Sequence, residues 1–248
     1  IKSDGLPTYL LSDLAYHYDK FIKRKFDVAV DIWGADHHGY AERLKKGVAA
    51  LAIDPAKLKI IITQLVRFVS GGKEVRMSKR AGEFVTMDEL IKEVGADATR
   101  FFFLMHAPGT HMDFDLDLAK ERSVKNPVYY AQYAYVRAAN ILNKVRGWRL
   151  NIGRTAFDLL KDESEKKLIL ELIKFSDVIL ETAQDYEVHR LTRYALELAK
   201  KFHHFYEKNK VVGAGKELEN ARLALVLAVK NTLNNLFGVL GISKPKKM

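Results

Sequence analysis

Cysteine is absent from the 248-residue sequence, which excludes disulfide bonds and metal sites built on thiolates. The sequence also lacks an uninterrupted apolar run of about 18 residues, so we expect no membrane-spanning helix. No secretory signal opens the chain, and a cytoplasmic protein fits these absences best. An initiator methionine is missing too, because the chain begins at Ile1, and we therefore expect a fragment of a longer protein.

The first half of the sequence has no net charge, and the excess of positive charge lies in the second half. Residues 1–118 carry 17 Lys and Arg against 17 Asp and Glu, so the whole net charge of +10 lies in residues 119–248. A basic region beside a neutral one favours a polyanionic partner, for which nucleic acid is the usual example. A solvated helical surface rich in lysine would give the same charge, and both interpretations stand at this point.

The first half alternates helix and strand patterns. Helices are expected over residues 6–25, 37–52, 87–94 and 97–105, and strands over residues 27–33 and 59–69. Strand, helix and strand at this spacing predict a parallel crossover unit. The sequence Ser70-Gly71-Gly72-Lys73 predicts a hairpin turn, and residues 106–115 are expected to form a polar link.

The second half shows helical periodicity and no clear strand pattern. Leu191, Ala195, Leu198 and Phe202, for example, share one helix face. Helices are expected over residues 116–124, 127–146, 163–184, 188–209 and 217–239. The predicted fold class is therefore α/β, a partial Rossmann-like parallel sheet in residues 1–118, followed by an all-α helical bundle in residues 119–248.

A basic string, Arg76-Met77-Ser78-Lys79-Arg80, follows the expected hairpin. When an adenylate forms, a carboxylate attacks the α-phosphate of ATP, and cations that meet the charge of the transition state lower the barrier. A loop with Lys79 among other cations suits that chemistry. Taken alone, the string is more typical of an exposed basic loop.

Two further clusters suit a small polar ligand. Tyr9 and Asp13 lie four residues apart on one face of the first helix, where a ring and a carboxylate could hold a planar cation. The string Gly34-Ala35-Asp36-His37-His38-Gly39 follows the first strand, and ligands bind beyond the carboxyl ends of such strands. An ordinary helix surface is the alternative for the first cluster and a zinc site for the second. Adjacent histidines on a helix diverge, which weakens the zinc interpretation.

Tyrosines gather near the start of the second half. Tyr129, Tyr130, Tyr133 and Tyr135 lie within ten residues of Arg137 along the chain. Aromatic rings beside a cation suit stacking on unpaired nucleic-acid bases. Packing inside the bundle is the alternative, because Tyr129 and Tyr133 stand in an i,i+4 relation.

The string VRMSKRAGEFVTMDELI resembles the signature loop of class I aminoacyl-tRNA synthetases, and of the arginyl-tRNA synthetase family in particular. Arg76 replaces the usual first lysine of that loop, and Arg80 replaces its final serine. The resemblance extends from Ser3 to Met248 through several strings in the family's order. These are SDGLPTYLLSDLAYHYDK, WGADHHGY, NPVYYAQYAYVR, AKKFHHFYEKNKV, ENARLALVLAVKNTL and LFGVLGISKPKKM.

The resemblance implies ATP-dependent ligation of arginine to tRNA-Arg through arginyl-adenylate, with Mg²⁺ accompanying ATP and no structural metal. It implies catalysis by Lys79 within the loop formed with Arg76, Met77, Ser78 and Arg80. The implied contacts to arginine or its adenylate come from Tyr9, Asp13, Gly34, Asp36, His37 and His38. The implied contacts to the anticodon come from Tyr130, Tyr133, Arg137, Tyr206 and Met248. The implied partners are tRNA-Arg, L-arginine and ATP, without a membrane, and the complete enzyme would be monomeric.

One motif of class I synthetases is missing. They carry an early His-x-Gly-His-type motif that handles ATP, whereas His106-Ala-Pro-Gly-Thr-His111 follows the signature loop and lies in the polar link. We therefore expect that the chain alone cannot form arginyl-adenylate. Two alternatives stay open: a class I synthetase of another amino-acid specificity, and a non-catalytic RNA-binding or interaction module built from synthetase parts.

Overall fold

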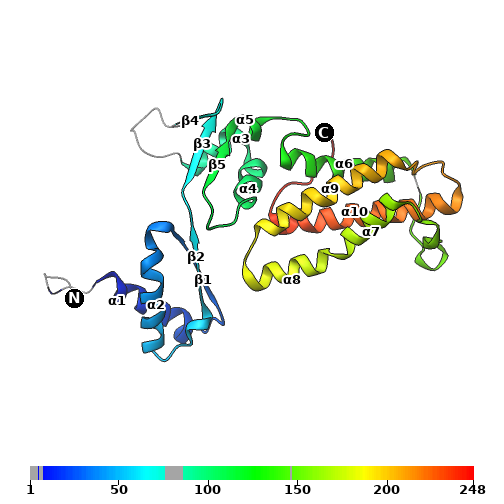
Figure 1. Cartoon of the computed structure of the whole chain (residues 1–248). Helices are drawn as coiled ribbons and strands as arrows, with labels where there is room; N and C mark the ends of the chain where they lie inside the picture. Colours follow the sequence, from blue (N-terminus) through cyan, green and yellow to red (C-terminus); the bar gives the residue numbers. More distant parts are fainter. Residues whose placement is uncertain (1–4, 6–7, 76–85, 146) are drawn as a thin grey trace. The chain divides into compact units, whose positions relative to one another are not determined.

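The structure is a computed structural model that describes residues 5, 8–75, 86–145 and 147–248 (Figure 1). The chain divides into two compact units. The first comprises residues 1–67 and 108–112, and the second comprises residues 68–107 and 113–248. The segment around 68–107 thus groups with the helical bundle by compactness. The predicted domain boundary at 118/119 concerns function. It stays a prediction, because a division by compactness does not test a division by function.

The first unit is built on a small parallel sheet. Its strands are β1 (Ala29–Gly34) and β2 (Leu58–Thr63), with Ala29 opposite Leu58 and Gly34 opposite Thr63. Helix α2 (His38–Ala50) connects them, so the predicted strand–helix–strand unit is confirmed. Helix α1 (Tyr9–Tyr18) precedes β1 and continues into a π-helical turn over Asp19–Lys23.

Both helices cover one face of this sheet. The core contains Phe21, Ala29, Leu44, Val48, Ile53 and Leu58. Helices α1 and α2 approach closely at Gly47, where a β-carbon would lie 2.6 Å from the Leu14 side chain, and only glycine fits that space. On the other face of β1, Val30 and Ile32 are exposed. Ala29, Asp31 and Trp33 therefore face the helices, as the period of two in a strand requires.

The expected strand over residues 59–69 was wrong. Two strands occur, β2 and β3 (Val66–Ser70), and they belong to different sheets. Between them the Gln64 N–H donates to the carbonyl of Pro108 (2.9 Å), and Leu65 is exposed. The sequence between residues 59 and 69 is rich in apolar residues throughout, but its strand hydrogen bonding is interrupted at Gln64 and Leu65, near the end of the first unit.

A second sheet has the order β4-β3-β5, with β4 at Lys73–Glu74 and β5 at Met112–Asp115. The predicted hairpin is confirmed, because β3 and β4 are antiparallel and Gly71 and Gly72 both adopt positive φ. Strand β5 lies inside the expected polar link. Its buried Met112 and Phe114 alternate with Asp113 and Asp115, a period-two pattern that the link interpretation overlooked.

Three short helices belong to the second unit beside that sheet. Helix α3 (Met87–Val94) begins with a capping box formed by Thr86 and Glu89. A single residue, Gly95 at φ +87°, joins α3 to α4 (Ala96–Leu104). Helix α5 (Leu116–Lys120) follows β5 and is shorter than expected.

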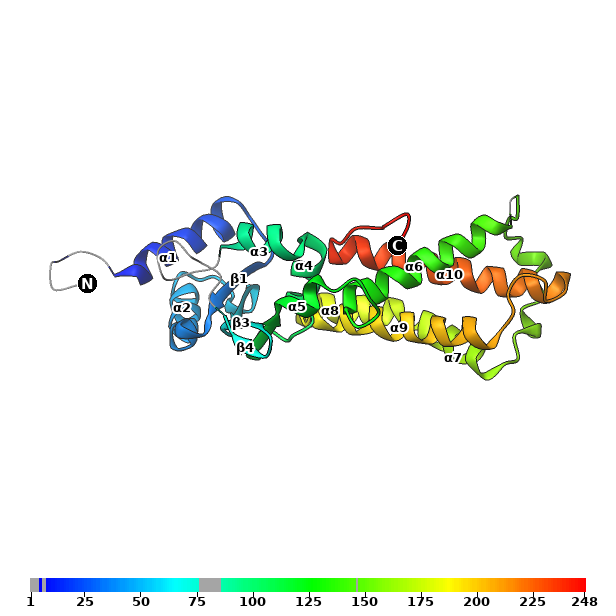
Figure 2. The same cartoon turned by 90° about the horizontal axis from the view of Figure 1, so that it is seen from above.

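The bundle consists of α6 (Pro127–Lys144), α7 (Glu163–Ile173), α8 (Phe175–Asp185), α9 (His189–Lys208) and α10 (Lys216–Leu240). Helices α6, α9 and α10 run side by side in both views (Figures 1 and 2). The expected single helix over 163–184 was wrong, since it divides at Lys174. The Tyr194 hydroxyl donates to the carbonyl of Glu171 (2.9 Å), which the N–H of residue 175 would bond in a continuous helix.

Helix α10 is long and apolar enough to cross a membrane by length and composition alone. Half of its most apolar window is nevertheless buried, and Leu223, Val226 and Leu233 are wholly inside the bundle. Its apolar character is therefore explained by its place as the core helix. The predicted fold class, a small parallel sheet followed by a helical domain, is confirmed.

Candidate functional site

The first unit contains a cavity of about 260 Å³ beside the carboxyl end of β1. Its lining comes from helix α1 with its π-helical extension, strand β1, the turn that leads into α2, and the first turn of α2. The lining residues are Asp13, Tyr16, His17, Lys20, Asp31, Trp33, His37 and Tyr40. Those from α1 follow a three- and four-residue spacing, which places them on one helix face.

The floor of the cavity is an ionised cluster. The Nδ1–H of His17 donates to the carbonyl of Asp13 (2.7 Å), and its Nε2–H donates to Asp31 Oδ2 (2.9 Å). Lys20 Nζ donates to the other oxygen of Asp31 (3.0 Å). Because both ring nitrogens face acceptors, the surroundings favour the protonated ring.

The pKa directions agree with this geometry. Burial alone would lower the pKa of His17, but the hydrogen bonds to Asp31 and to the Asp13 carbonyl raise it above its ordinary value. Burial likewise opposes the ionised form of Asp31, yet the hydrogen bonds from His17 and Lys20 lower its pKa. Asp31 is thus held as a carboxylate between two cations.

Asp13 has a different environment. Its Oδ2 accepts a hydrogen bond from the Tyr40 hydroxyl (2.5 Å), and burial together with this carboxylate raises the pKa of Tyr40 to about 12. Among the described residues, no cation forms a salt bridge with Asp13. The rings of Tyr16 and Trp33 line the same cavity. A carboxylate without a cationic partner, next to flat rings, suits a planar cation.

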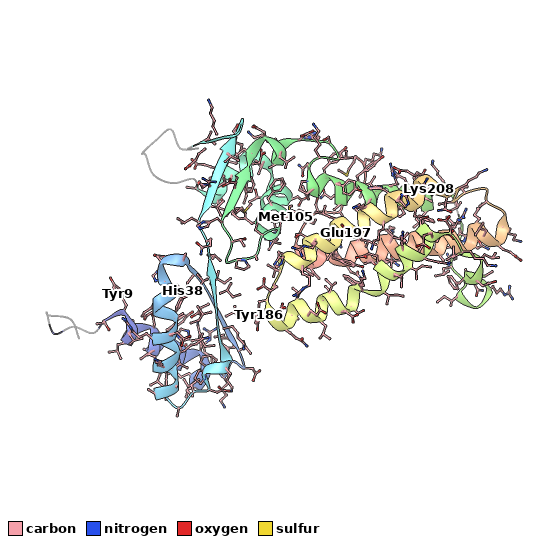
Figure 3. All side chains as sticks on the ribbon, viewed as in Figure 1. Tyr9, His38, Met105, Tyr186, Glu197 and Lys208 are labelled. Carbon is pink, nitrogen blue, oxygen red and sulfur yellow. The ribbon has the colours of Figure 1, made fainter. Side chains whose placement is uncertain are left out.

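The structure places the sequence-predicted ligand residues unevenly. Asp13 and His37 line the cavity. Tyr9 is 80% exposed, and Asp36 and His38 are exposed as well, with Asp36 3.5 Å from His37 Nε2 (Figure 3 labels Tyr9 and His38). A β-carbon on Gly34 would lie 2.7 Å from the Asp36 carboxylate, so a larger residue would require the exposed Asp36 side chain to move. The ligand roles of Tyr9, Gly34, Asp36 and His38 stay predictions.

Sequence reasoning missed six lining residues: Tyr16, His17, Lys20, Asp31, Trp33 and Tyr40. Extending the helical spacing from Asp13 would have indicated the members on α1. The signature loop residues Arg76, Met77, Ser78, Lys79 and Arg80 lie outside the described residues, so their roles stay predictions. Within the described ranges, no group of three His, Cys, Asp or Glu could hold a metal ion.

A second candidate site lies on the bundle, where α6 and α9 face each other. We call it the α6–α9 face and define it by Tyr130, Tyr133, Arg137, His203 and Tyr206. Arg137 is its centre, donating one hydrogen bond to Nδ1 of His203 (2.9 Å) and another to the Tyr133 hydroxyl (2.9 Å). Its guanidinium carbon lies 4.6 Å from the centre of the Tyr133 ring and 5.0 Å from that of Tyr206.

His203 is held neutral on this face. Burial and the nearby Arg137 cation lower its pKa to about 4, and a backbone interaction with Tyr130 offsets part of this shift. The Tyr130 ring packs against the imidazole edge to face, with centroids 4.9 Å apart. A neutral imidazole can accept from Arg137, which a protonated ring could not.

Four of the five predicted anticodon residues, Tyr130, Tyr133, Arg137 and Tyr206, are brought together here. Met248 is exposed in the C-terminal segment. Tyr135 is half-buried and instead packs on Phe237 of α10, with ring centroids 5.9 Å apart, so it lies on a different side of α6. Sequence reasoning missed His203, although its position one turn before Tyr206 on α9 was a usable signal.

Comparison with known proteins covers both sites. Residues 131–248 match the family model of the DALR anticodon binding domain. The arginine–tRNA ligase of Desulforudis audaxviator is 46% identical to the whole chain, which covers 45% of that protein. That of Listeria monocytogenes serotype 4b is 48% identical, again with 45% of its length covered. The chain thus spans about half the length of the curated relatives it matches.

Solved structures give the same picture. The whole chain superposes on 54% of a putative arginyl-tRNA synthetase from Campylobacter jejuni, with a TM-score of 0.84 and 33% identity. It also superposes on 50% of the Thermus thermophilus arginyl-tRNA synthetase, with a TM-score of 0.83. Identity in the second case is 20%, so that likeness concerns the fold alone.

Proposed function

We propose that this chain, which is homologous over its whole length to the C-terminal part of arginine–tRNA ligases and carries the DALR anticodon binding domain, supplies the arginine pocket and the anticodon-reading surface of such a ligase. The complete protein would join arginine to tRNA-Arg through arginyl-adenylate, using ATP and Mg²⁺. The cavity around Asp13 is the observation that carries this proposal.

The cavity would select arginine by its side chain. The guanidinium group is planar and has five N–H donors, and Asp13 offers it a carboxylate that no described cation neutralises. Tyr40 donates to one oxygen of that carboxylate and so fixes its orientation. The rings of Tyr16 and Trp33 would cover the flat faces of the guanidinium. Lys20 and His17 would not repel it strongly, because both are paired with Asp31.

The α6–α9 face would read unpaired bases of the anticodon. Partly exposed tyrosines beside Arg137 offer flat surfaces for stacking. Neutral His203 orients the guanidinium without adding a second charge. The basic excess of residues 119–248 would attract the phosphate backbone, and that attraction weakens with salt.

Chemistry at the α-phosphate would fall to the signature loop, with Lys79 meeting the charge of the transition state. Mg²⁺ would enter with ATP. Without the early His-x-Gly-His-type motif, the chain alone would form no arginyl-adenylate. The exposed Val30 and Ile32 on β1 agree with a larger sheet in the complete protein.

The proposal is tested by RNA binding. The chain is titrated with a tRNA-Arg transcript and with the same transcript carrying a swapped anticodon, at two salt concentrations. We expect a preference for the native anticodon at both concentrations. Equal affinities that collapse together at the higher salt would overturn anticodon reading and leave a non-specific RNA-binding module.

The amino-acid specificity has its own test. Adenylate formation by the complete ligase is measured with arginine, lysine and citrulline. Arginine should be strongly preferred, because lysine lacks the planar fork and citrulline lacks the charge. Preference for an uncharged amino acid would indicate a class I synthetase of another specificity.

A further inference from the structure

The C-terminal segment leaves the bundle in a defined way. Helix α10 ends at Gly241 in the left-handed conformation (φ +67°), and Ile242 is buried at 6% exposure. The exposed residues from Ser243 onward follow, and we call residues 242–248 the tail. In both views the tail ends beside α6 (Figures 1 and 2).

Ser243 forms hydrogen bonds with two side chains from distant parts of the sequence, Asp97 and Gln132. Its N–H donates to Asp97 Oδ1 (2.9 Å), and its hydroxyl donates to Asp97 Oδ2. Gln132 Nε2 donates to the carbonyl of Ser243 (3.1 Å) and to Asp97 Oδ2 (2.7 Å). Both main-chain polar groups of Ser243 are therefore bound by side chains, and we call this three-residue network the clasp.

The clasp joins three elements. Asp97 lies in the first turn of α4, where the helix dipole favours a carboxylate. One turn later, Arg100 covers the backbone at Gly241, where a β-carbon would lie 3.3 Å from the arginine side chain. Gln132 is buried on α6, two residues after Tyr130 and one before Tyr133 in the sequence, and its side chain points to a different side of the helix from theirs. Helix α4 thus holds the tail to the same helix that carries two of the proposed base-contacting tyrosines.

The tail carries an unusual concentration of charge. Lys244, Lys246 and Lys247 are all exposed, and among the described residues none of them forms a salt bridge. Three unpaired cations beside α6 suit the phosphates of a polyanion. A tail without attachment would lose conformational entropy on binding, and an attachment formed in advance removes part of that cost.

We propose that Asp97 is a positioning residue for RNA binding, which holds the tail beside α6 through the clasp so that Lys244, Lys246 and Lys247 meet RNA phosphates. The proposal rests on the RNA-binding function proposed above. It assigns that role to a helix outside the region matched by the anticodon-binding family model.

The substitution Asp97→Asn separates this role from simple charge. It makes the surface more positive, so electrostatic attraction alone predicts tighter RNA binding. The clasp predicts weaker binding, because an amide nitrogen would face the donors of Gln132 and Ser243. We expect the dissociation constant for the tRNA-Arg transcript to rise on the order of tenfold. Asp177→Asn on α8 makes the same charge change without touching the clasp and should not weaken binding.

A double-mutant cycle tests whether Asp97 acts through the tail. Deleting residues 244–248 should weaken binding and make the salt dependence of affinity shallower, by up to about 3 in the log–log slope. In that background Asp97→Asn should have no further effect. Ser243→Pro removes both donors from a residue outside any helix, and so serves as a second variant if Asp97→Asn perturbs folding.

The outcomes separate the two proposals. If the wild-type chain binds the transcript and folded Asp97→Asn or Ser243→Pro binds it equally well, the proposed role of Asp97 is wrong and the proposed function is unaffected. Independent, additive losses from Asp97→Asn and the deletion also overturn that role. Hydrogen exchange of the tail provides the complementary readout: faster exchange with unchanged RNA affinity would assign the clasp a structural role only. A wild-type chain that fails to bind tRNA-Arg overturns both proposals.

Discussion

The cavity of the first unit and the α6–α9 face of the second each contain a buried histidine, His17 and His203. Burial disfavours the charged form of both rings, but their neighbours differ. His17 faces two acceptors, the Asp31 carboxylate and the Asp13 carbonyl, and its pKa is raised. His203 faces the guanidinium of Arg137 and its pKa falls to about 4.

The contrast shows that hydrogen-bond partners, and not burial alone, decide the charge of a buried histidine. It also matches the kinds of ligand proposed for the two sites. The cavity is a network of ionised groups with one carboxylate left for a small cation. The α6–α9 face has a single cation held by neutral rings, which suits flat bases. Three predictions test this comparison, beginning with the largest expected effect.

Replacing Asp13 with Asn should weaken the binding of arginine in the cavity. The substitution keeps the shape and removes the charge that would meet the guanidinium. We expect the complete ligase to lose arginine affinity by about 2–5 kcal/mol, as for a buried charge pair that loses one partner. Equilibrium binding of arginine measures the loss.

The matched control for Asp13 is Asp36→Asn. Asp36 was a predicted ligand residue, but its side chain is 80% exposed and does not line the cavity. An effect well under about 1 kcal/mol is expected, since exposed charges contribute little. Equal losses from the two substitutions would contradict the placement of the arginine pocket around Asp13.

Replacing Tyr133 with Ala tests the aromatic side of the comparison. If the ring stacks on a base, tRNA-Arg affinity should fall by about 1–3 kcal/mol. Tyr133→Phe keeps the ring and loses the hydroxyl that accepts from Arg137, so it should retain most of the affinity. Unchanged affinity in a folded Tyr133→Ala variant would return this residue to bundle packing.

The pH dependence of unfolding compares the two histidines directly. His203 has a folded pKa of about 4 against 6.5 unfolded, so its contribution is full above pH 6.5 and is lost as pH falls toward 4. The expected loss is about 0.8 kcal/mol between about pH 7.5 and about pH 6. His17 has the opposite sign: its raised folded pKa gives a contribution that is full below 6.5 and is lost as pH rises through the folded pKa.

Urea unfolding at several pH values measures this difference. His203→Gln should flatten the acid side of the profile, and His17→Gln should flatten the side above neutrality. His204, the exposed neighbour of His203, supplies the control, because its replacement should leave the profile unchanged. Profiles that respond identically to His17→Gln and His203→Gln would contradict opposite charge states.

The sequence was sufficient where local signals agreed. Helix α6 begins at Pro127 as expected, because Asn126 caps it and proline fits its first turn. The hairpin was predictable from Gly71 and Gly72. The split between α7 and α8 was not, since it follows from a hydrogen bond made by Tyr194, a residue on another helix. Strand β5 was predictable from the alternation of Met112 and Phe114 with Asp113 and Asp115, but the segment is only four residues long and lies among polar residues.

The sites divide in the same way. The resemblance to a known family singled out Asp13, and aromatic clustering beside a cation indicated Tyr130, Tyr133 and Arg137; the structure places Asp13 in the cavity and brings the other three together, while their ligand roles stay predictions. The floor of the cavity was not predictable, since Asp31 reaches His17 and Lys20 only once β1 has packed against α1. The pKa of His203 is lowered by its burial between α6 and α9 and then by Arg137, which lies 66 positions away in the sequence. Neither relation is written in a local pattern.

The exposed outer face of β1 has a practical consequence for anyone who prepares this chain by itself. Val30 and Ile32 project from a strand that pairs only with β2 within the described residues. Such a strand presents both unpaired backbone groups and apolar side chains, the two features that drive edge-to-edge aggregation. The isolated chain should therefore self-associate through β1 as its concentration rises, so binding assays call for dilute samples, and size-exclusion chromatography over a range of concentrations measures the effect.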